Sequence, residues 1–176
     1  MSESEKSRPT ASELVSLWGL ELMATENVMF SQTYVASTVG ADGKALSTAI
    51  VGLLTDDSQS YSDIHRLPTD EIWHFYLGDP IELLLLHPDG TDDLVVLGQD
   101  VMRNEEIQFV VPAGVWMGAK LQTGGEYGVF GNTMAPGYSL SDFEGAVAED
   151  LIEGWPHRSE LIRTMIRPDK PIRYFD

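Results

Sequence analysis

The residues of this chain best suited to chemistry lie in one short stretch that contains two histidines and a glutamate. Glu71 follows His65 by six residues, and His74 comes three residues later. An imidazole beside a carboxylate can act as a general base whose tautomer the carboxylate fixes. The same pair also occurs as a purely structural hydrogen bond, which here would join His65 to Glu71 or Asp70. The pattern leaves a catalytic and a structural interpretation of His65 and Glu71 open.

A strand that begins at Glu71 alternates its side chains between two faces. One face carries Glu71, Trp73 and Phe75, and the other carries Ile72, His74 and Tyr76. This alternation directs His74 away from Glu71, so we expect His74 to be structural or interfacial. His87 and His157 lie beside turn prolines, and we expect both to be solvated.

The spacing of His65, Glu71 and Gly78 resembles the first motif of the cupins, and Pro112-Ala113-Gly114 with Met117 is similar to the second. The longer runs HRLPTDEIWHFYLGDPIELLLL, VVPAGVW and APGYSLSDFE resemble the fifth cupin family, a domain of unknown function. The similarity extends from about Ala11 to Arg167. It implies a small-molecule-binding jelly roll, usually dimeric, that is close in shape to the dTDP-sugar epimerases.

The resemblance also implies a metal site of three histidines and one carboxylate, and this chain departs from that pattern. Leu67 and Met117 stand at two of the histidine positions. A thioether suits copper(I) rather than zinc, iron or manganese, so Met117 does not replace a histidine. We therefore expect no cofactor and no bound metal. A divalent metal, if present, would be held by His65 and Glu71 and, less readily, by His74.

Several further residues are candidates for ligand binding. Trp73, Phe75, Val115 and Met117 would line an apolar pocket, although aromatic residues at strand spacing also build ordinary cores. Arg66 is the best single anchor for one carboxylate or phosphate, but an extended segment would direct it away from His65. Tyr127 or Tyr138 would suit the general acid that partners His65.

Charge and composition narrow the partner class. The 176 residues include 11 Lys plus Arg, 28 Asp plus Glu and no Cys, which gives a formal net charge of −17 and excludes thiol chemistry. Between Asn27 and Glu144 the cations are only Lys44, Arg66, Arg103 and Lys120, against 17 acidic residues. Such a surface disfavours nucleic acid, anionic membranes and a diphosphate sugar. We expect a soluble, cytoplasmic protein whose ligand is a neutral or cationic small molecule.

The pattern of the chain predicts a mainly β, antiparallel jelly-roll barrel with an N-terminal helix and C-terminal helices. Thr10 and Glu13 resemble a capping box before an apolar stripe at Leu14, Leu17, Trp18, Leu20 and Leu22. Short β-rich runs with turn signals fill 28–134, and helical spacing returns over 142–166. We predict a disordered tail at 1–10, one cupin domain at 11–167 and a C-terminal tail at 168–176.

Three functions remain open at this stage. The first is a metal-independent epimerase or isomerase, with His65 as the base and Glu71 orienting it. The second is a ligand-binding or sensory cupin without turnover, and the third is a metal-dependent dioxygenase or lyase. We also predict a homodimer, in which the helix at 14–22 or the strand at 28–39 covers a sheet edge.

Overall fold

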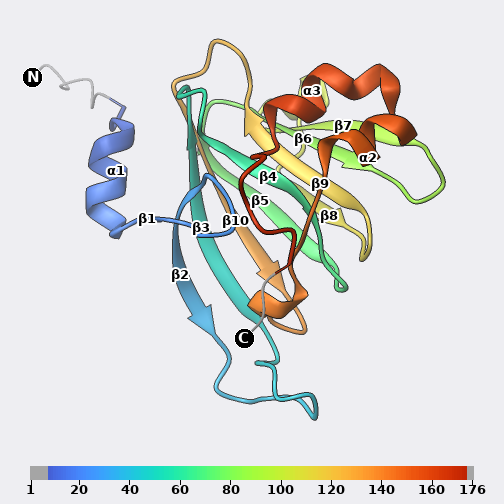
Figure 1. Cartoon of the computed structure of the whole chain (residues 1–176). Helices are drawn as coiled ribbons and strands as arrows, with labels where there is room; N and C mark the ends of the chain where they lie inside the picture. The colour runs from blue at the N-terminus through green and yellow to red at the C-terminus, as the bar shows by residue number, and fades with distance from the viewer. Residues whose placement is uncertain (1–7, 174–176) are drawn as a thin grey trace, which may run out of the picture.

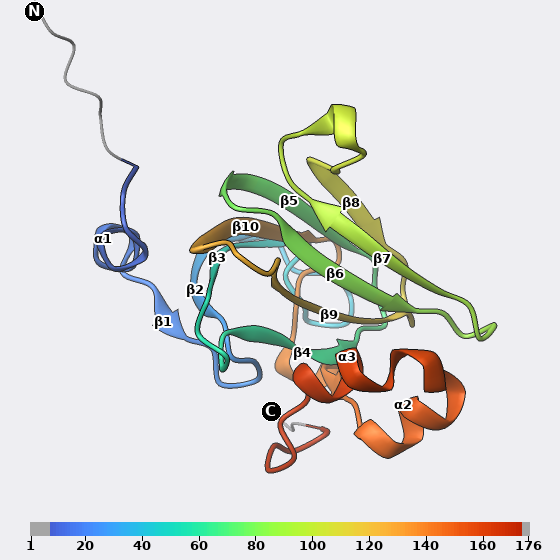
Figure 2. The ribbon, with the colours of Figure 1, turned by 90° about the horizontal axis from the view of Figure 1, so that it is seen from above.

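Two antiparallel sheets face one another in the computed structural model, which describes residues 8–173 (Figures 1 and 2). The first sheet has the order β1 (Glu21–Leu22), β2 (Met29–Val35), β3 (Thr48–Thr55), β10 (Tyr127–Met134), β5 (Glu71–Gly78), β8 (Gln108–Val111). The second has the order β11 (Glu144–Gly145), β4 (Tyr61–Arg66), β9 (Trp116–Leu121), β6 (Ile81–Leu86), β7 (Asp92–Leu97). The predicted antiparallel jelly roll is confirmed.

The space between the sheets is filled by apolar side chains over most of its length. These come from both sheets and include Leu54, Trp73, Leu83, Leu85, Leu97, Met117, Leu121 and Phe130. Gly78 ends β5 at a φ of 104°, a conformation that L side chains rarely adopt, and it lets the chain turn into β6. The predicted turns therefore set the lengths of the strands; β5 buries one face, whereas β4 and β10 are buried on both faces.

The N-terminal helix α1 (Ala11–Trp18) begins with the predicted capping box between Thr10 and Glu13. It ends at Gly19, which has a φ of 59°, so the apolar stripe that we traced to Leu22 continues into β1 and not into the helix. Leu14 is buried in a cluster with residues of β3 and β10, whereas the side chain of Leu17 is 73% exposed. The helix thus lies beside the edge of the first sheet (Figure 1).

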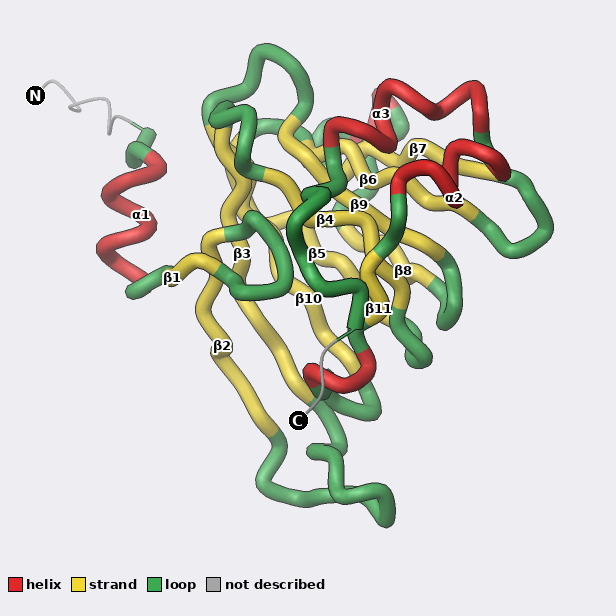
Figure 3. Tube along the Cα trace, viewed as in Figure 1, coloured by secondary structure: helices red, strands yellow, loops and turns green. Residues whose placement is uncertain are grey.

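The C-terminal region is helical only in pieces (Figure 3). The prediction of helical structure from residue 142 onward is wrong for Glu144–Gly145, which form β11 against β4. After β11 come α2 (Ala148–Gly154), η3 (Pro156–Arg158) and α3 (Ser159–Thr164), with η1 (Val101–Arg103) and η2 (Leu140–Asp142) elsewhere. Pro156 occupies the first turn of η3, where the missing N–H of proline costs no hydrogen bond. Helices α2 and α3 cover the outer face of the second sheet.

Parts of the two predicted tails make defined contacts. Arg8 forms a two-point ion pair with Asp79, at 2.7 and 2.9 Å, and Arg173 pairs with Glu144 at 3.1 Å. Residues 1–7 and 174–176 of the predicted tails lie outside the described residues. Within residues 8–173, no helix is long and apolar enough to cross a membrane.

Candidate functional site

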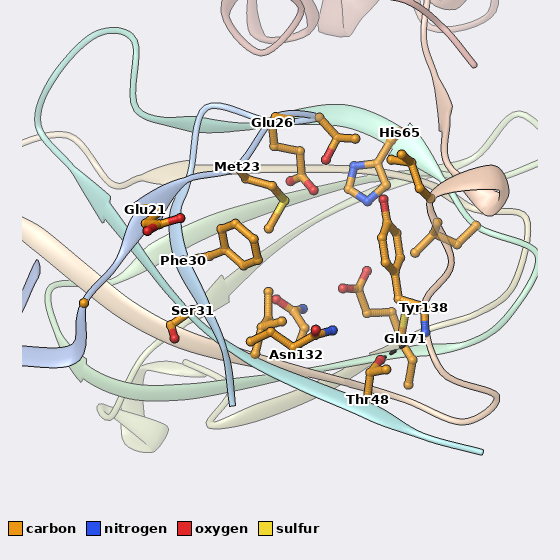
Figure 4. Close-up of a pocket in the computed structure, with 18 residues that line it drawn as sticks. Glu21, Met23, Glu26, Phe30, Ser31, Thr48, His65, Glu71, Asn132 and Tyr138 are labelled. Atoms are coloured by element: carbon orange, nitrogen blue, oxygen red, sulfur yellow. Dashed lines mark hydrogen bonds between the residues drawn. The ribbon is translucent and has the colours of Figure 1, made fainter. Parts of the chain in front are cut away.

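A cavity of about 660 Å³ lies between the sheets at one end of the interior (Figure 4). Its buried floor comes from four strands and two loops and comprises Thr25, Thr48, His65, Leu67, Glu71, Asn132 and Met134. Its exposed rim comprises Gly19, Glu21, Ala24, Gln32 and Leu140. The cavity therefore has a polar, sheltered floor and a mouth beside β1, β2 and η2.

His65 is the ionisable base on this floor, and its ring is fixed by its own strand. Its Nδ1 lies 2.7 Å from the carbonyl oxygen of Asp63, and the ring stacks on Phe143 with 4.9 Å between ring centroids. A carbonyl can only accept, so the neutral ring carries its proton on Nδ1 and keeps the Nε2 lone pair free. The ring reaches into the cavity (Figure 4), where Nε2 can take a proton from a bound molecule.

The prediction of which group hydrogen-bonds His65 is wrong. Glu71 or Asp70 was predicted to orient the ring, but the backbone carbonyl of Asp63 does so. Asp70 instead accepts a hydrogen bond of 2.8 Å from the backbone N–H of Ala113. The pairing of β4 with β9 shifts register between Ser62 and His65, and this local irregularity lets a side chain reach a carbonyl two residues earlier.

Asp63 is itself held in place by the C-terminal segment. The backbone N–H and the Nε of Arg167 donate to the Asp63 carboxylate at 2.8 and 2.6 Å. Burial raises the pKa of Asp63, and the hydrogen bonds and charge of Arg167 oppose that rise. The orientation of His65 therefore depends on a contact with residues more than 100 positions later in the chain.

Glu71 is the buried acid of the site. Burial raises its pKa to about 7; the charge of His65 opposes this rise, and the nearby carboxylate of Glu26 adds to it. Among the described residues, no donor reaches its Oε2 atom. Near neutral pH this carboxyl group is thus poised between its two protonation states, and one of its oxygens is left for a ligand or water.

Three further polar side chains approach the same space. Glu26 accepts a short hydrogen bond from the hydroxyl of Ser62, and Asn132 presents a buried amide whose Nδ2 has no acceptor within residues 8–173. Tyr138 extends its ring toward His65 (Figure 4). The candidate acid Tyr138 and the candidate base His65 are therefore brought together.

Four of the predicted ligand-binding residues lie elsewhere in the interior. Trp73, Phe75, Val115 and Met117 are buried in the packed core and do not line the cavity. Trp73 stacks on Phe130 with 4.7 Å between ring centroids. Their side chains face inward as the alternation predicts, but at a level of the barrel that other side chains fill.

Arg66 and Tyr127 also lie away from the cavity. The guanidinium of Arg66 donates two hydrogen bonds of 2.9 Å to Glu144 and lies 4.5 Å from the ring centre of Trp116. Tyr127 is buried beneath α1, in the cluster with Leu14, and the guanidinium of Arg8 covers its ring. Neither side chain can touch a molecule bound beside His65.

The donors present do not fit the metal site that the resemblance implies. His74 lies on the outer face of β5, where it accepts from Gln108 at 3.0 Å and bonds Thr133 at 2.9 Å. The floor offers His65 and Glu71, with Leu67 beside them. Within residues 8–173, no group of three His, Asp or Glu side chains is arranged to hold a metal ion. Two donors leave most of a divalent ion's coordination unsatisfied.

The two remaining histidines form hydrogen bonds with carboxylates on the surface. His87 lies 2.8 Å from Asp93, and His157 lies 2.5 Å from Asp92. Both pairs lie outside the cavity, and each connects a segment to β7.

Sequence reasoning missed several cavity residues, among them Glu21, Glu26, Phe30, Thr48 and Asn132. Asn132 lies on β10 with the inward parity of Phe130 and Met134, so alternation along a β-strand was the signal that could have found it. Glu26 lies in a loop and carries no such signal. In the part of the chain that the structure describes, no Lys or Arg lines the cavity, which agrees with the acidic composition of the barrel.

Comparisons with known proteins agree with the fold observed in the structure. The profile of a family described as the Cupin superfamily (DUF985) matches residues 12–146. No curated protein matches the sequence. A structural-genomics target from Shewanella oneidensis is 26% identical with a TM-score of 0.83, over 92% of this chain and 100% of that chain.

Two other solved structures are similar to this chain. A hypothetical protein from Leishmania major is 25% identical with a TM-score of 0.79, over 90% of this chain and 99% of its own. A cupin 2 conserved barrel domain protein from Rhodopseudomonas palustris shares 14% identity and a TM-score of 0.54, over 81% of each chain. The last likeness concerns the fold alone.

Proposed function

The chain belongs to the Cupin superfamily (DUF985), and on this premise we propose that it is a metal-independent epimerase or isomerase for a sugar or another small carbonyl compound. The observation that carries the proposal is the hydrogen bond of 2.7 Å between His65 Nδ1 and the carbonyl of Asp63. It leaves Nε2 of the neutral ring as a proton acceptor within a sheltered cavity.

The proposed reaction is a proton transfer at the carbon next to the carbonyl. The C–H bond breaks, its proton goes to His65 Nε2, and the electron pair moves onto the carbonyl oxygen as an enolate. The buried Nδ2 of Asn132 can donate to that oxygen, and the Glu71 carboxylate can stabilise the imidazolium that forms. Return of a proton to the opposite face, with Tyr138 as the donor, gives the epimer.

The polar character of the floor supports this function. Burial raises the pKa of Glu71 to about 7, and such perturbed groups cluster where protein side chains move protons. Donors and acceptors without partners, at Asn132 Nδ2 and Glu71 Oε2, give a bound carbonyl compound two places to bond.

Solvent-deuterium exchange tests the proposal. The protein is incubated in heavy water with a panel of aldoses and ketoses, and NMR follows loss of the proton beside the carbonyl. We expect exchange in the wild type and a loss of at least about a hundredfold in His65→Asn, because general base catalysis contributes that much. His87→Asn, outside the cavity, is the matched control.

Unchanged exchange in His65→Asn would overturn the proton transfer. A compound that raises the melting temperature but emerges without deuterium would favour a cupin that binds a ligand without turnover.

We further propose that two copies associate through the edge of the first sheet. β1 pairs only with Met29 and Phe30, so the rest of β2 offers an open edge, with Tyr34 and Val35 more than half exposed. A dimeric mass by light scattering at micromolar concentration is expected, and a monomeric mass would contradict it.

A further inference from the structure

The described lining of the cavity is acidic and contains no lysine or arginine, and this bears on which small molecule it takes. Glu21 lies on the rim, Glu26 lies on the wall, and Glu71 lies on the floor. Among residues 8–173, no lysine or arginine lines the space, and Arg66, the arginine next to His65 in sequence, is paired with Glu144. An anion placed here would meet like charges from these three residues, and protonated His65 would be the one described lining group able to offset them.

Two buried polar atoms give an independent sign that the site expects a ligand. Within residues 8–173, Glu71 Oε2 has no donor at hydrogen-bond distance, the indole N–H of Trp73 being the group that approaches the carboxylate, and Asn132 Nδ2 has no acceptor. The two residues are 7% and 6% exposed, so each is more than nine-tenths buried. Leaving buried polar atoms without partners is costly, and a ligand with one donor and one acceptor would satisfy both.

The carboxylates of Glu26 and Glu71 also interact unfavourably. Glu26 raises the pKa of Glu71, which is what a nearby like charge does. A cationic group between the two would replace this repulsion with two attractions. An ammonium group has the donors that such a position requires, and the ring of Phe30 on the same wall offers it an aromatic face.

From these contacts we infer that the cavity selects a small hydroxylated amine, such as an amino sugar, and rejects phosphorylated and carboxylated analogues. The ammonium lies between Glu26 and Glu71, and a hydroxyl or carbonyl oxygen of the ligand accepts from Asn132 Nδ2. The inference rests on the proposed function only in taking this cavity as the binding site.

Calorimetric titration with matched sugars tests the inference. The probes are glucose and galactose, their 2-amino-2-deoxy derivatives, the N-acetyl forms of these, and the amino sugars' 6-phosphates. At about pH 6.5 the amines carry a proton. We expect the amino sugars to bind about tenfold or more tightly than their neutral forms, because hydrogen bonds to charged groups contribute that much. The 6-phosphates should bind most weakly.

Variants of the acidic wall give a second readout. Glu26→Gln should reduce the preference for the amine over its N-acetyl form by about tenfold. Because Glu26 also bonds Ser62, Glu26→Gln alters that bond as well as the charge, so Glu21→Gln, on the exposed rim, provides a second test of charge. Glu21→Gln should reduce the preference for the amine by a smaller factor than Glu26→Gln. Glu106→Gln, exposed and outside the cavity, is the matched control and should change nothing.

The outcomes separate this inference from the proposed function. The amine preference is overturned if the neutral or phosphorylated forms bind as tightly as the amines or more tightly, or if no amine binds. In either case, deuterium exchange on a neutral sugar would still support the proposed proton transfer. Selective amine binding without any exchange supports the inference and overturns the proposed reaction.

Discussion

The two ends of the space between the sheets differ in what fills them. At one end, Trp73 and Phe130 stack among aliphatic side chains and leave no room. At the other, His65, Glu71 and Asn132 surround a cavity of about 660 Å³. Strand β5 runs through both, since it contributes Glu71 to the cavity and Trp73 to the core. One strand thus contributes neighbouring inward residues to the packed core and to the cavity.

This difference suggests that the cavity end tolerates unfavourable groups because the packed end stabilises the fold. Burying Glu71 raises its pKa to about 7, and the buried amide of Asn132 lacks an acceptor within residues 8–173. Both features lower the stability of a folded protein. Both groups line the cavity, where a bound molecule could reach them.

The largest expected effect is the loss of stability when a side chain at the packed end is truncated to alanine, compared with the same change at the cavity end. Trp73→Ala removes a fully buried side chain from the packed end and should lower the free energy of unfolding by about 3–5 kcal/mol. Phe30→Ala, on the wall of the cavity, should cost about 1 kcal/mol, because its side chain already borders open space. Urea unfolding measures both, and equal losses would remove the distinction between the two ends.

The next prediction concerns the cost of the buried acid. Because the pKa of Glu71 is about 7 in the folded protein against an ordinary 4.5, folding takes up a proton between these pH values. The free energy of unfolding therefore falls as pH rises through that interval. The Glu71→Gln side chain cannot ionise. The free energy of unfolding of this variant, relative to that of wild type, should therefore increase by about 3 kcal/mol as the pH is raised from below 4.5 to above 7. Urea unfolding at several pH values measures this.

Glu106→Gln is the control for that pH series, since its side chain is exposed. Parallel stability curves for wild type and Glu71→Gln would show that Glu71 titrates normally and is not a buried, poised acid.

The donor argument against a metal site can be reversed by one substitution. Leu67 lies two residues after His65 and lines the cavity, so Leu67→His adds a second imidazole beside His65 and Glu71. We expect zinc at a hundredfold excess over its dissociation constant to stabilise this variant by about 2–3 kcal/mol. Thermal unfolding with and without zinc measures the shift. An equal shift in the wild type would contradict the donor argument.

The smallest effect is expected at Arg66, which belongs neither to the packed core nor to the cavity lining. Arg66→Ala breaks a partly exposed ion pair with Glu144 and a contact with Trp116, and should cost about 1 kcal/mol. Titration of any cavity ligand should give unchanged affinity. A large loss of affinity would return Arg66 to the role of anchor.

The sequence was sufficient for the fold, and the structure places the predicted residues His65 and Glu71 in the lining of one cavity. Turn signals and alternation predicted the antiparallel jelly roll, and the burial along β5 confirms that Glu71, Trp73 and Phe75 share the inward face. Alternation specifies a face but not a depth along the strand. Whether an inward residue meets a cavity or a packed layer depends on side chains from other strands, so Trp73 and Phe75 could not be separated from Glu71 by pattern alone.

Contacts between distant segments were beyond prediction for a different reason. Asp63, which orients His65, is bound by Arg167, and the two are separated by more than 100 residues without any shared periodicity. The side-chain roles of Glu26 and Asn132 likewise follow from how a loop and a strand close over β4. Parity on β10 could have placed Asn132 inward, but not beside Glu71.

The tautomer of His65 tests the central claim most directly. In protein labelled with ¹⁵N, long-range ¹H–¹⁵N NMR spectra of the neutral imidazole distinguish the nitrogen that carries the proton from the one that does not. The hydrogen bond to Asp63 predicts a protonated Nδ1 and a bare Nε2. A protonated Nε2 in the neutral ring would contradict the account, because no base would then face the cavity.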